Sequence, residues 1–378
     1  MDIKNFCGGD FFVNERDYLI WLSSIPGLSL KRQKKMIKIF GSAHDIWAAP
    51  EKLIFMFDGF PKNILENIVN YKNEKKIIAY QNLMAKNKIK FISYLDEDYP
   101  KLLKTIEDYP LGIYVLGELP SDKYIKISIV GSRKYTEYGA YVTHKFAYDL
   151  AKKNIVIVSG MARGIDSVAH KSAMEAGGKT IAVLGCGLNI CYPPENNKLR
   201  EEIINNGCLI SEFALGTKPL TGNFPMRNRI ISGLSNGLIV TEANEKSGTL
   251  ITVGHALDQK RKVMAVPGAI NNMFSQGTNY LIKQGANLIM NCKDVLELIG
   301  ENEKIENNLS EKNIPNTNIL LDNEEKIIYD LIGLEQTSFD FIVSNTNLPI
   351  NKLSSCLMML EMRGIIKKLP GQKYIRAS

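Results

Sequence analysis

Hydrophobic residues recur with different periods along the chain. Up to about residue 87 the spacing is mostly helical. Within Ile25–Trp47 the apolar positions can share one face of a helix, and Gly41 is expected to end that helix. From about residue 88 to 300, short runs that are apolar throughout, such as IKISIVGS and GLIVTEA, alternate with helical patterns such as YGAYVTHKFAYDLAKK. Such runs are typical of strands that are buried on both faces. The alternation predicts an α/β domain with a parallel, doubly wound sheet.

The last part of the chain departs from this alternation. Residues 301–320 are polar and rich in asparagine, which predicts a flexible linker. Residues 321–378 give three helical patterns and a terminal hairpin, IIKKLPGQKYIR, an order that favours a winged helix-turn-helix. We therefore expect a small helical domain over residues 1–87, a Rossmann-like domain over residues 88–300, the linker, and a winged-helix domain.

The N-terminal domain contains a Pro-Gly turn followed by a basic helix, in the segment IPGLSLKRQKKMIKIF. This arrangement is similar to a helix-hairpin-helix, which binds nucleic-acid phosphates through the N–H groups of its turn. Ser29 stands where that motif usually has its second glycine. A purely structural helical domain is therefore favoured over a nucleic-acid contact.

Composition narrows the class of protein without fixing a function. The chain has 378 residues, a net charge of +7 and a sequence pI of about 8.9, which permits an anionic partner without demanding one. No apolar run approaches a membrane span, and the N-terminus lacks the features of a signal peptide. The six cysteines form no Cys-x-x-Cys pair. We expect a cytoplasmic protein without a disulfide frame, metal site or cofactor.

Small residues and helix starts follow several of the expected strands. In a parallel α/β sheet, ligands bind beyond the carboxyl ends of the strands, where exposed N–H groups suit phosphate. The turns expected there are Gly131-Ser132-Arg133, Ser159–Asp166 (SGMARGID), Gly185-Cys186-Gly187 and Ser247-Gly248-Thr249. Their convergence on one edge predicts a phosphate-binding site.

The segment FPMRNR adds two arginines to this edge. Pro225 suits the first turn of a helix, and Asn223 is a plausible cap. Arg227 and Arg229 would then lie at a helix start, where the dipole already favours an anion. Phe224 either packs in the core or stacks a base beside these cations. Lys218, in the preceding loop, either contacts phosphate or is a solvated lysine.

Other chemistries leave weaker signals. GCGLNI lacks the third glycine of a dinucleotide fingerprint, and no P-loop motif is present. Asp166 and His170 share a helix face, either as an acid–base pair or, as we favour, with Asp166 at the helix start and His170 hydrogen-bonded back to it. Glu212 and Glu242 are either catalytic carboxylates or partners that orient the arginines through salt bridges.

Taken together, these motifs resemble the DprA/Smf family of DNA-processing proteins. The resemblance rests on IVGSRKYTEYG, SGMARGIDSVAHKSAMEAGGKTIAVLGCGLNICYPPEN, LISEF, NFPMRNRIISGLSNGLIVTEANEKSGTLIT and AVPGAI, in that order. It implies an extended Rossmann-like fold, with a helical domain before it and a winged-helix domain after it. It also implies a homodimer that binds single-stranded DNA without strong sequence preference, protects it and loads the RecA recombinase during natural transformation.

The resemblance also implies which residues contact DNA. They are Ser132, Arg133, Gly160, Arg163, Gly164, Lys218, Asn223, Phe224, Arg227 and Arg229. No catalytic residue is implied, so the protein is expected not to be an enzyme.

The competing hypothesis is enzymatic, because the same fold is similar to the Lonely Guy nucleotide phosphoribohydrolases. In the corresponding run NEKSGTLIT, Thr252 stands where that family has its catalytic glutamate. This change argues against N-glycosidic cleavage unless Glu242 or Glu212 substitutes. A nucleotide-sensing module without catalysis is a third possibility.

Overall fold

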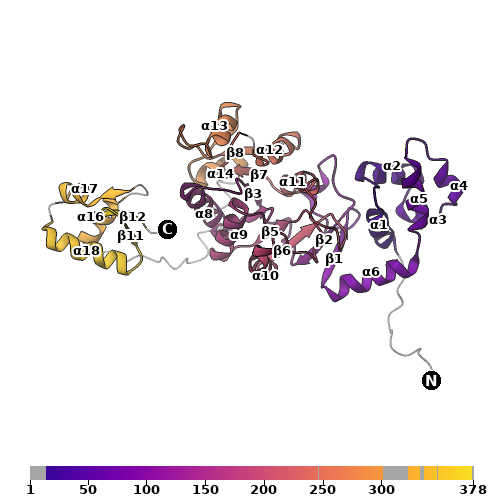
Figure 1. Cartoon of the computed structure of the whole chain (residues 1–378), viewed down its shortest axis with the longest axis horizontal. Coiled ribbons are helices and arrows are strands. Elements are labelled where there is room, and N and C mark those ends of the chain that lie inside the picture. The colour runs from indigo at the N-terminus through magenta and orange to yellow at the C-terminus, as the bar shows by residue number, and fades with distance from the viewer. Residues whose placement is uncertain (1–13, 246, 301–321, 333–335, 347, 377–378) are drawn as a thin grey trace, which may run out of the picture. The chain divides into compact units, whose positions relative to one another are not determined.

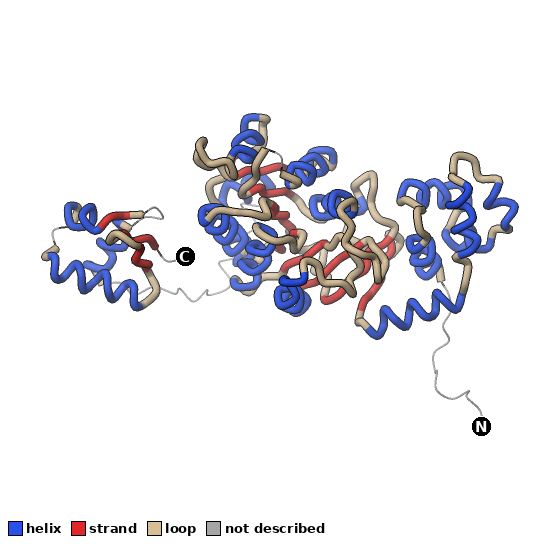
Figure 2. Tube along the Cα trace, viewed as in Figure 1, coloured by secondary structure: helices blue, strands red, loops and turns tan. Residues whose placement is uncertain are grey.

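The structure is a computed structural model that describes residues 14–245, 247–300, 322–332, 336–346 and 348–376. The chain divides into two compact units, Met1–Ile305 and Glu306–Ser378. Figures 1 and 2 show the elements of both units, and each unit is described by itself. The predicted linker, residues 301–320, lies outside the described residues, and the predicted domain boundaries stay predictions.

The first unit begins with helices, as the helical spacing predicts. Their bounds are α1 Glu15–Ser24, α2 Leu30–Phe40, α3 Ala43–Ala48, α4 Glu51–Phe55, α5 Lys62–Asn70 and α6 Glu74–Lys86. A capping box formed by Asn14 and Asp17 starts α1. Gly41, at a φ of 101°, ends α2 as predicted. Met36 is fully buried in the core that these helices share, and Ile37 and Phe40 pack against that core.

One large sheet follows the helices. Within the described part of residues 14–300 it has nine strands in the order β1-β2-β6-β5-β4-β3-β7-β8-β9. Their bounds are β1 Ile89–Ser93, β2 Gly112–Gly117, β3 Lys126–Val130, β4 Val156–Ser159, β5 Thr180–Val183, β6 Gly207–Ser211, β7 Gly237–Val240, β8 Lys262–Ala265 and β9 Asn287–Leu288. The strands from β6 to β9 in this order pair in parallel, which confirms the predicted parallel sheet. The β1–β2 and β2–β6 pairs are antiparallel and were not predicted.

Helices cover both faces of the sheet. On one face, α8 (Glu137–Lys152), α9 (Ile165–Glu175) and α14 (Cys292–Ile299) bury residues such as Phe146 and Leu150. On the other face lie α7 (Lys101–Lys104), α11 (Asn223–Gly233), α12 (Thr249–Asp258) and α13 (Gln276–Lys283). A 3₁₀ turn, Pro194–Asn196, leads into α10, Asn197–Asn205. The sheet is therefore doubly wound, and its strand order reverses at β3, between β4 and β7. Ligands of such sheets bind at that reversal.

The second unit has the helices and hairpin of a winged helix. Its elements are α16 Asn323–Leu331, β10 Thr337–Ser338, α17 Phe339–Ser344, α18 Ile350–Met362, β11 Ile366–Leu369 and β12 Lys373–Arg376. The helices bury Ile328, Ile342 and Leu357 around one small core. Lys352 of α18 and Arg363 at its C-cap pair with Glu324 and Glu325, respectively. None of the helices in the described residues is both long and apolar enough to cross a membrane.

Candidate nucleic-acid interface

A cleft of about 810 Å³ opens at the carboxyl edge of the sheet, where the strand order reverses. It is bounded by the turn after β3, the loop after β7, and the first turns of α11 and α12. Side chains from these segments that line it include Ser132, Arg133, Lys134, Phe224, Arg227, Asn228, Ser247 and Thr249. A smaller adjoining pocket shares Arg133, Phe224 and Arg227, and is completed by Gly160, Arg163, Gly185 and Tyr192. The predicted turns therefore do converge.

Two glycine-containing turns interlock to form one wall. Gly164 has a φ of +85°, and a Cβ on it would lie 2.7 Å from the Cα of Arg133. The backbone N–H of Ile165 donates to the carbonyl oxygen of Ser132 at 3.2 Å. The SGMARG turn can therefore sit against the Gly-Ser-Arg turn only because Gly164 carries no side chain and tolerates this φ. Arg133 and Arg163 project from the two turns and are both exposed.

Asp166 fixes the shape of the SGMARG turn. Its carboxylate accepts hydrogen bonds from the backbone N–H groups of Gly160 (3.1 Å) and Ala162 (3.3 Å). Burial raises the pKa of this carboxyl, and the positive charge of Arg227 opposes the shift. His170 does not bond back to Asp166, contrary to our prediction. Its Nδ1 lies 2.7 Å from the Thr180 hydroxyl, and burial lowers its pKa to about 3. A neutral, enclosed imidazole of this kind is a structural group.

Arg227 and Arg229 have different roles in the structure. Arg227 is buried beneath the cleft, where its guanidinium donates to the carbonyl oxygens of Gly160 (3.0 Å) and Val183. Burial lowers its pKa to about 10, so it stays charged at neutral pH. Arg229 points away, because residues two apart on a helix differ by about 200° in direction. It pairs with Glu212 and, at 3.2 Å, with Asp108, and it lines neither pocket.

The helix start itself differs from our prediction at one residue. Gly222, not Asn223, is the N-cap of α11, and Pro225 lies in the first turn as expected. The side chain of Asn223 donates to the carbonyl oxygen of Lys218 at 3.2 Å and therefore holds the preceding loop. Lys218 is exposed, and neither residue lines the two pockets.

Phe224 is half-buried at the junction of the two pockets. Its ring centroid lies 5.4 Å from that of Tyr192 and 5.9 Å from the guanidinium carbons of Arg133 and Arg227. A Cβ on Gly185 would lie 2.8 Å from the Phe224 ring, so the Gly-Cys-Gly turn makes room for the aromatic side chain. Tyr192 and Lys134 were not predicted as site residues. Lys134 directly follows the Gly-Ser-Arg turn, but Tyr192 has no local signal and reaches the site only through the fold.

The two buried glutamates have structural partners. Glu242 accepts from the backbone N–H (2.9 Å) and the hydroxyl (2.6 Å) of Thr136, the N-cap of α8, so it stabilises that helix start rather than an arginine. Glu212 pairs with Arg229, as one of our alternatives proposed, although burial raises the pKa of its carboxyl. Thr252 lines the cleft where a hydrolase would need a carboxylate. This arrangement argues against N-glycosidic cleavage.

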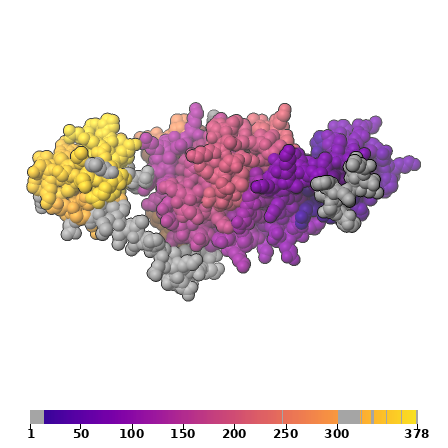
Figure 3. Space-filling view, turned by 90° about the horizontal axis from the view of Figure 1, so that it is seen from below, coloured from indigo at the N-terminus to yellow at the C-terminus, as the bar shows by residue number. Residues whose placement is uncertain are grey.

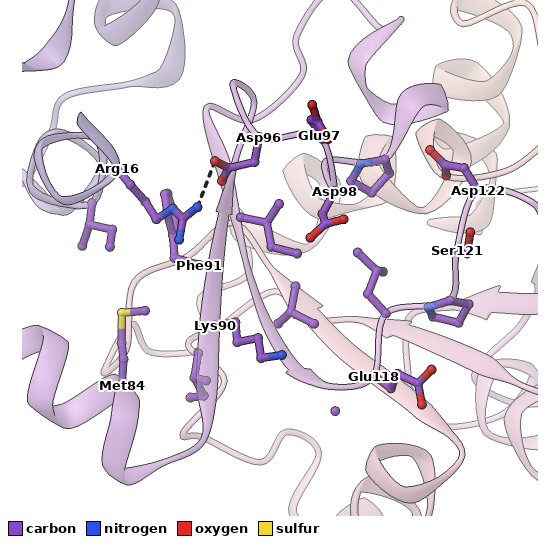
Figure 4. A pocket seen from close by; sticks show the side chains of 18 of the residues that line it. Arg16, Met84, Lys90, Phe91, Asp96, Glu97, Asp98, Glu118, Ser121 and Asp122 are labelled. Atoms are coloured by element: carbon purple, nitrogen blue, oxygen red, sulfur yellow. Dashed lines mark hydrogen bonds and ion pairs between the residues drawn. The ribbon is translucent and has the colours of Figure 1, made fainter. Parts of the chain in front are cut away.

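A second large cleft, of about 890 Å³, lies between α1, α6 and the edge strand β1 (Figure 4). Its carboxylates include Asp96, Glu97, Asp98, Glu118 and Asp122. Arg16 contacts Asp96 at 2.9 Å across it, as Figure 4 shows, and so is already paired. Because these acidic side chains outnumber the bases of its lining, this cleft disfavours phosphate, and the cleft at the strand reversal is the better nucleic-acid candidate. No described residues form a cluster of histidine, cysteine or carboxylate side chains that could hold a metal.

Comparisons with known proteins agree on one family. The family model described as DNA recombination-mediator protein A matches residues 90–300, and the one described as DprA winged helix domain matches residues 315–372. Protein Smf of Synechocystis sp. is 32% identical over 96% of this chain and 99% of its own length. DNA processing protein DprA of Streptococcus pneumoniae is 44% identical over 54% of this chain and 72% of its own length.

Solved structures give the same result. The X-ray structure of DprA from Streptococcus pneumoniae matches with a TM-score of 0.64 and 33% identity, covering 75% of this chain and 98% of that one. DNA processing protein A from Helicobacter pylori, whose structure is described as giving insight into single-stranded DNA binding, matches with a TM-score of 0.50 and 30% identity. That match covers 57% of this chain and 96% of the other.

Proposed function

This chain belongs to the DprA/Smf family of DNA-processing proteins, and from that premise we propose that it binds single-stranded DNA in the cleft at the strand reversal. The observation that carries the proposal is the position of Phe224. Its ring lies within 6 Å of the Tyr192 ring and of the guanidinium carbons of Arg133 and Arg227, where three glycine-containing turns meet.

The proposed binding mode combines contacts to phosphates with one contact to a base. Arg133, Lys134 and Arg163 are exposed cations at the wall of the cleft and its adjoining pocket and would neutralise successive phosphates. The N-terminus of α12, at Thr249, also lines the cleft, so the positive end of its helix dipole would favour the same anions. Phe224, with Tyr192 beside it, would stack an unpaired base, which a duplex does not present. Stacking and phosphate contacts tolerate any base, so we propose binding without strong sequence preference.

A carboxylate already contacts Arg163, and a DNA phosphate would have to replace it. Its guanidinium pairs with Glu195, and both side chains are about half exposed. Solvent and salt screen an exposed pair of this kind, so a phosphate can replace the carboxylate at small cost. Lys218 and Asn223, which line neither pocket, remain proposed contacts in the loop before α11.

The test is fluorescence anisotropy with a labelled poly-dT oligomer, an unlabelled blunt duplex as competitor, and a salt series. We expect salt-sensitive binding, with a slope near −0.7 per phosphate neutralised, and poor competition by the duplex. R133A/K134A should lower both affinity and slope. A matched control, K152A/K153A at the end of α8, removes the same charge at the opposite edge of the sheet. Equal behaviour of the two variants would contradict the site.

Three finer parts of the function rest on the family. We propose that the protein protects the bound strand in the cytoplasm, that it loads RecA recombinase onto it during transformation, and that it does so without catalysis. RecA loading would appear as faster filament formation on a strand coated with single-strand-binding protein. Unchanged filament formation would contradict this part alone.

We also propose that the protein is a homodimer. In the described residues β9 is the last strand at one end of the sheet, and near it Leu288, Met290 and Tyr280 are exposed apolar or aromatic side chains. An unpaired strand edge with exposed apolar residues suits a self-complementary interface. Sedimentation of the intact chain and of M290D would test it, with dissociation expected for the variant.

The alternative is a nucleotide hydrolase or sensor. Release of free base from nucleoside monophosphates would support the enzyme. Tight mononucleotide binding with weak oligomer binding would support the sensor.

A further inference from the structure

Helix α2 carries a concentration of positive charge that the cleft does not use. Of its eleven residues, Leu30–Phe40, five are cationic and none is acidic: Lys31, Arg32, Lys34, Lys35 and Lys38. In the part of the chain that the structure describes, none of the five pairs with a carboxylate. Lys31, Lys35 and Lys38 are exposed and recur at helical spacing, so they share one side, here called the basic face. Uncompensated like charges at this spacing repel one another, which a bound polyanion would relieve.

Aromatic side chains lie directly beside the basic face. Phe57 and Phe60 pack edge to face with centroids 5.0 Å apart. The Lys35 ammonium lies 5.8 and 5.6 Å from these two rings, and the Arg32 guanidinium lies 5.8 Å from Phe60. Cations held against aromatic rings beside a charged face are the combination that single-stranded nucleic acids favour.

The topology places α2 at the same edge of the sheet as the cleft. Strand β2 runs antiparallel to β6 and pairs Tyr114 with Ser211, so β2 begins where β6 ends. The loop before β2 therefore lies at the carboxyl edge of the parallel strands. Lys34 of α2 is anchored on that loop: its ammonium donates to the carbonyl oxygen of Glu107 at 2.8 Å and lies 3.4 Å from the Tyr109 ring centroid.

The same loop also contacts the helix that forms the cleft. Asp108 pairs with Arg229 of α11 at 3.2 Å. A continuous series of contacts thus runs from the cleft through α11 and the 105–111 loop to α2. Figure 1 shows α11 and α2 along the same upper side of this unit. From β3, where the strand order reverses, to β2 the sheet advances four strands, or about 19 Å, so a DNA strand that leaves the cleft needs only a few nucleotides to approach α2.

We propose that the basic face of α2 is a second phosphate-binding surface for the same single strand, beyond the cleft. This inference rests on the proposed function, since it extends the path of the bound strand. It assigns to the N-terminal helices a direct contact with nucleic acid, which Ser29 in the hairpin motif had argued against. The contact would come from side chains along the helix rather than from the N–H groups of the turn.

The experiment compares oligomer lengths. Binding of labelled dT oligomers of about 6 and about 20 nucleotides is measured over a salt series for the intact chain and for K31Q/K35Q/K38Q. If the three lysines neutralise three phosphates, the salt slope for the long oligomer should fall by about 2, while the short oligomer should bind unchanged. A charge-preserving variant, K31R/K35R/K38R, should keep the wild-type slope.

A matched control removes the same charge elsewhere. K145Q/K152Q/K153Q changes three lysines of α8 and its C-cap, toward the opposite edge of the sheet, and should leave both oligomers unaffected. The inference is overturned by an unchanged slope for the long oligomer, by equal losses for both lengths, or by equal losses in the control. An unchanged slope would leave an acidic protein segment as the better occupant. Failure of the wild-type chain to bind either oligomer would instead refute the proposed function, and the inference with it.

Discussion

Replacing Arg229 by alanine should destabilise the fold without weakening DNA binding by the folded protein. The Arg229 side chain is 5% exposed and its partner Glu212 is 10% exposed, so the substitution leaves a buried carboxylate without its counter-charge. Breaking a buried pair in this way costs about 3–5 kcal/mol. The pair with Asp108 adds little, because that side chain is 52% exposed. At about 2–4 °C per kcal/mol, the melting temperature should fall by roughly 6–20 °C.

The pH dependence gives the same prediction an internal check. Burial already raises the pKa of Glu212 in the folded protein, and loss of Arg229 removes the charge that opposes this shift. A carboxyl whose folded pKa lies above its unfolded value is penalised where it is ionised. The loss of stability therefore grows as pH rises from the unfolded pKa of the carboxyl to its folded pKa, and it shrinks as pH falls. The stability deficit of R229A should accordingly be smaller at about pH 5 than at about pH 8.

The assays are thermal unfolding at several pH values and anisotropy with poly-dT at a temperature where both proteins are folded. E212Q/R229M, which removes both charges, should recover part of the lost stability. The reasoning would be refuted if R229A melted like the wild type. It would equally be refuted if R229A lowered the salt slope of DNA binding, because Arg229 would then reach phosphate.

Three further positions, two at the cleft and one in the core, separate effects on binding from effects on folding. F224A should lose about 1–3 kcal/mol of single-strand affinity while F224W retains it, measured by anisotropy; equal affinity for F224A would exclude stacking. G164A should destabilise by about 1–3 kcal/mol in denaturant unfolding, because its φ of +85° is unfavourable for alanine and a Cβ would collide with the Arg133 backbone; a normal midpoint would contradict the close packing of the two turns. Burial lowers the pKa of His170 in the folded protein to about 3, below its unfolded value. Protonation of this side chain should therefore lower the free energy of unfolding by about 1.4 kcal/mol per pH unit as pH falls from about 6 to about 4. Denaturant unfolding of H170N over the same pH range should lack this contribution.

The fold was largely predictable because its parallel strands are short and mostly apolar. Strands such as Lys126–Val130 and Gly237–Val240 are buried at every position, so the short apolar runs in the sequence correctly indicated strands covered on both faces. The antiparallel pair β1–β2 was missed although Ile89–Ser93 alternates in burial, because its partner strand lies some twenty residues further on. Strand direction and order depend on contacts between distant segments, which periodicity does not report.

The site was predictable as a set of turns and less so as a set of side chains. Local sequence placed glycines and cations at the carboxyl edge of the sheet, because the ends of parallel strands must meet there. It did not say which cations face the cleft, and Arg229, which was expected there, pairs with Glu212 and lines neither pocket. The two-residue spacing from Arg227 already excludes a shared direction on a helix, whereas the family resemblance implies a DNA contact for both arginines.

Buried charged residues around this cleft stabilise the fold, whereas exposed ones are available to bind DNA. Asp166, Glu242 and Arg227 form hydrogen bonds to backbone groups of the turns or helix starts around it. Desolvation makes these groups costly to leave unpaired, so their variants should first lose stability. Arg133 and Lys134 are exposed and hold no such bonds among the described contacts, so their variants should lose affinity and salt dependence with the fold intact. The presence of an arginine therefore does not distinguish a DNA contact from a structural ion pair. Its burial in the fold does.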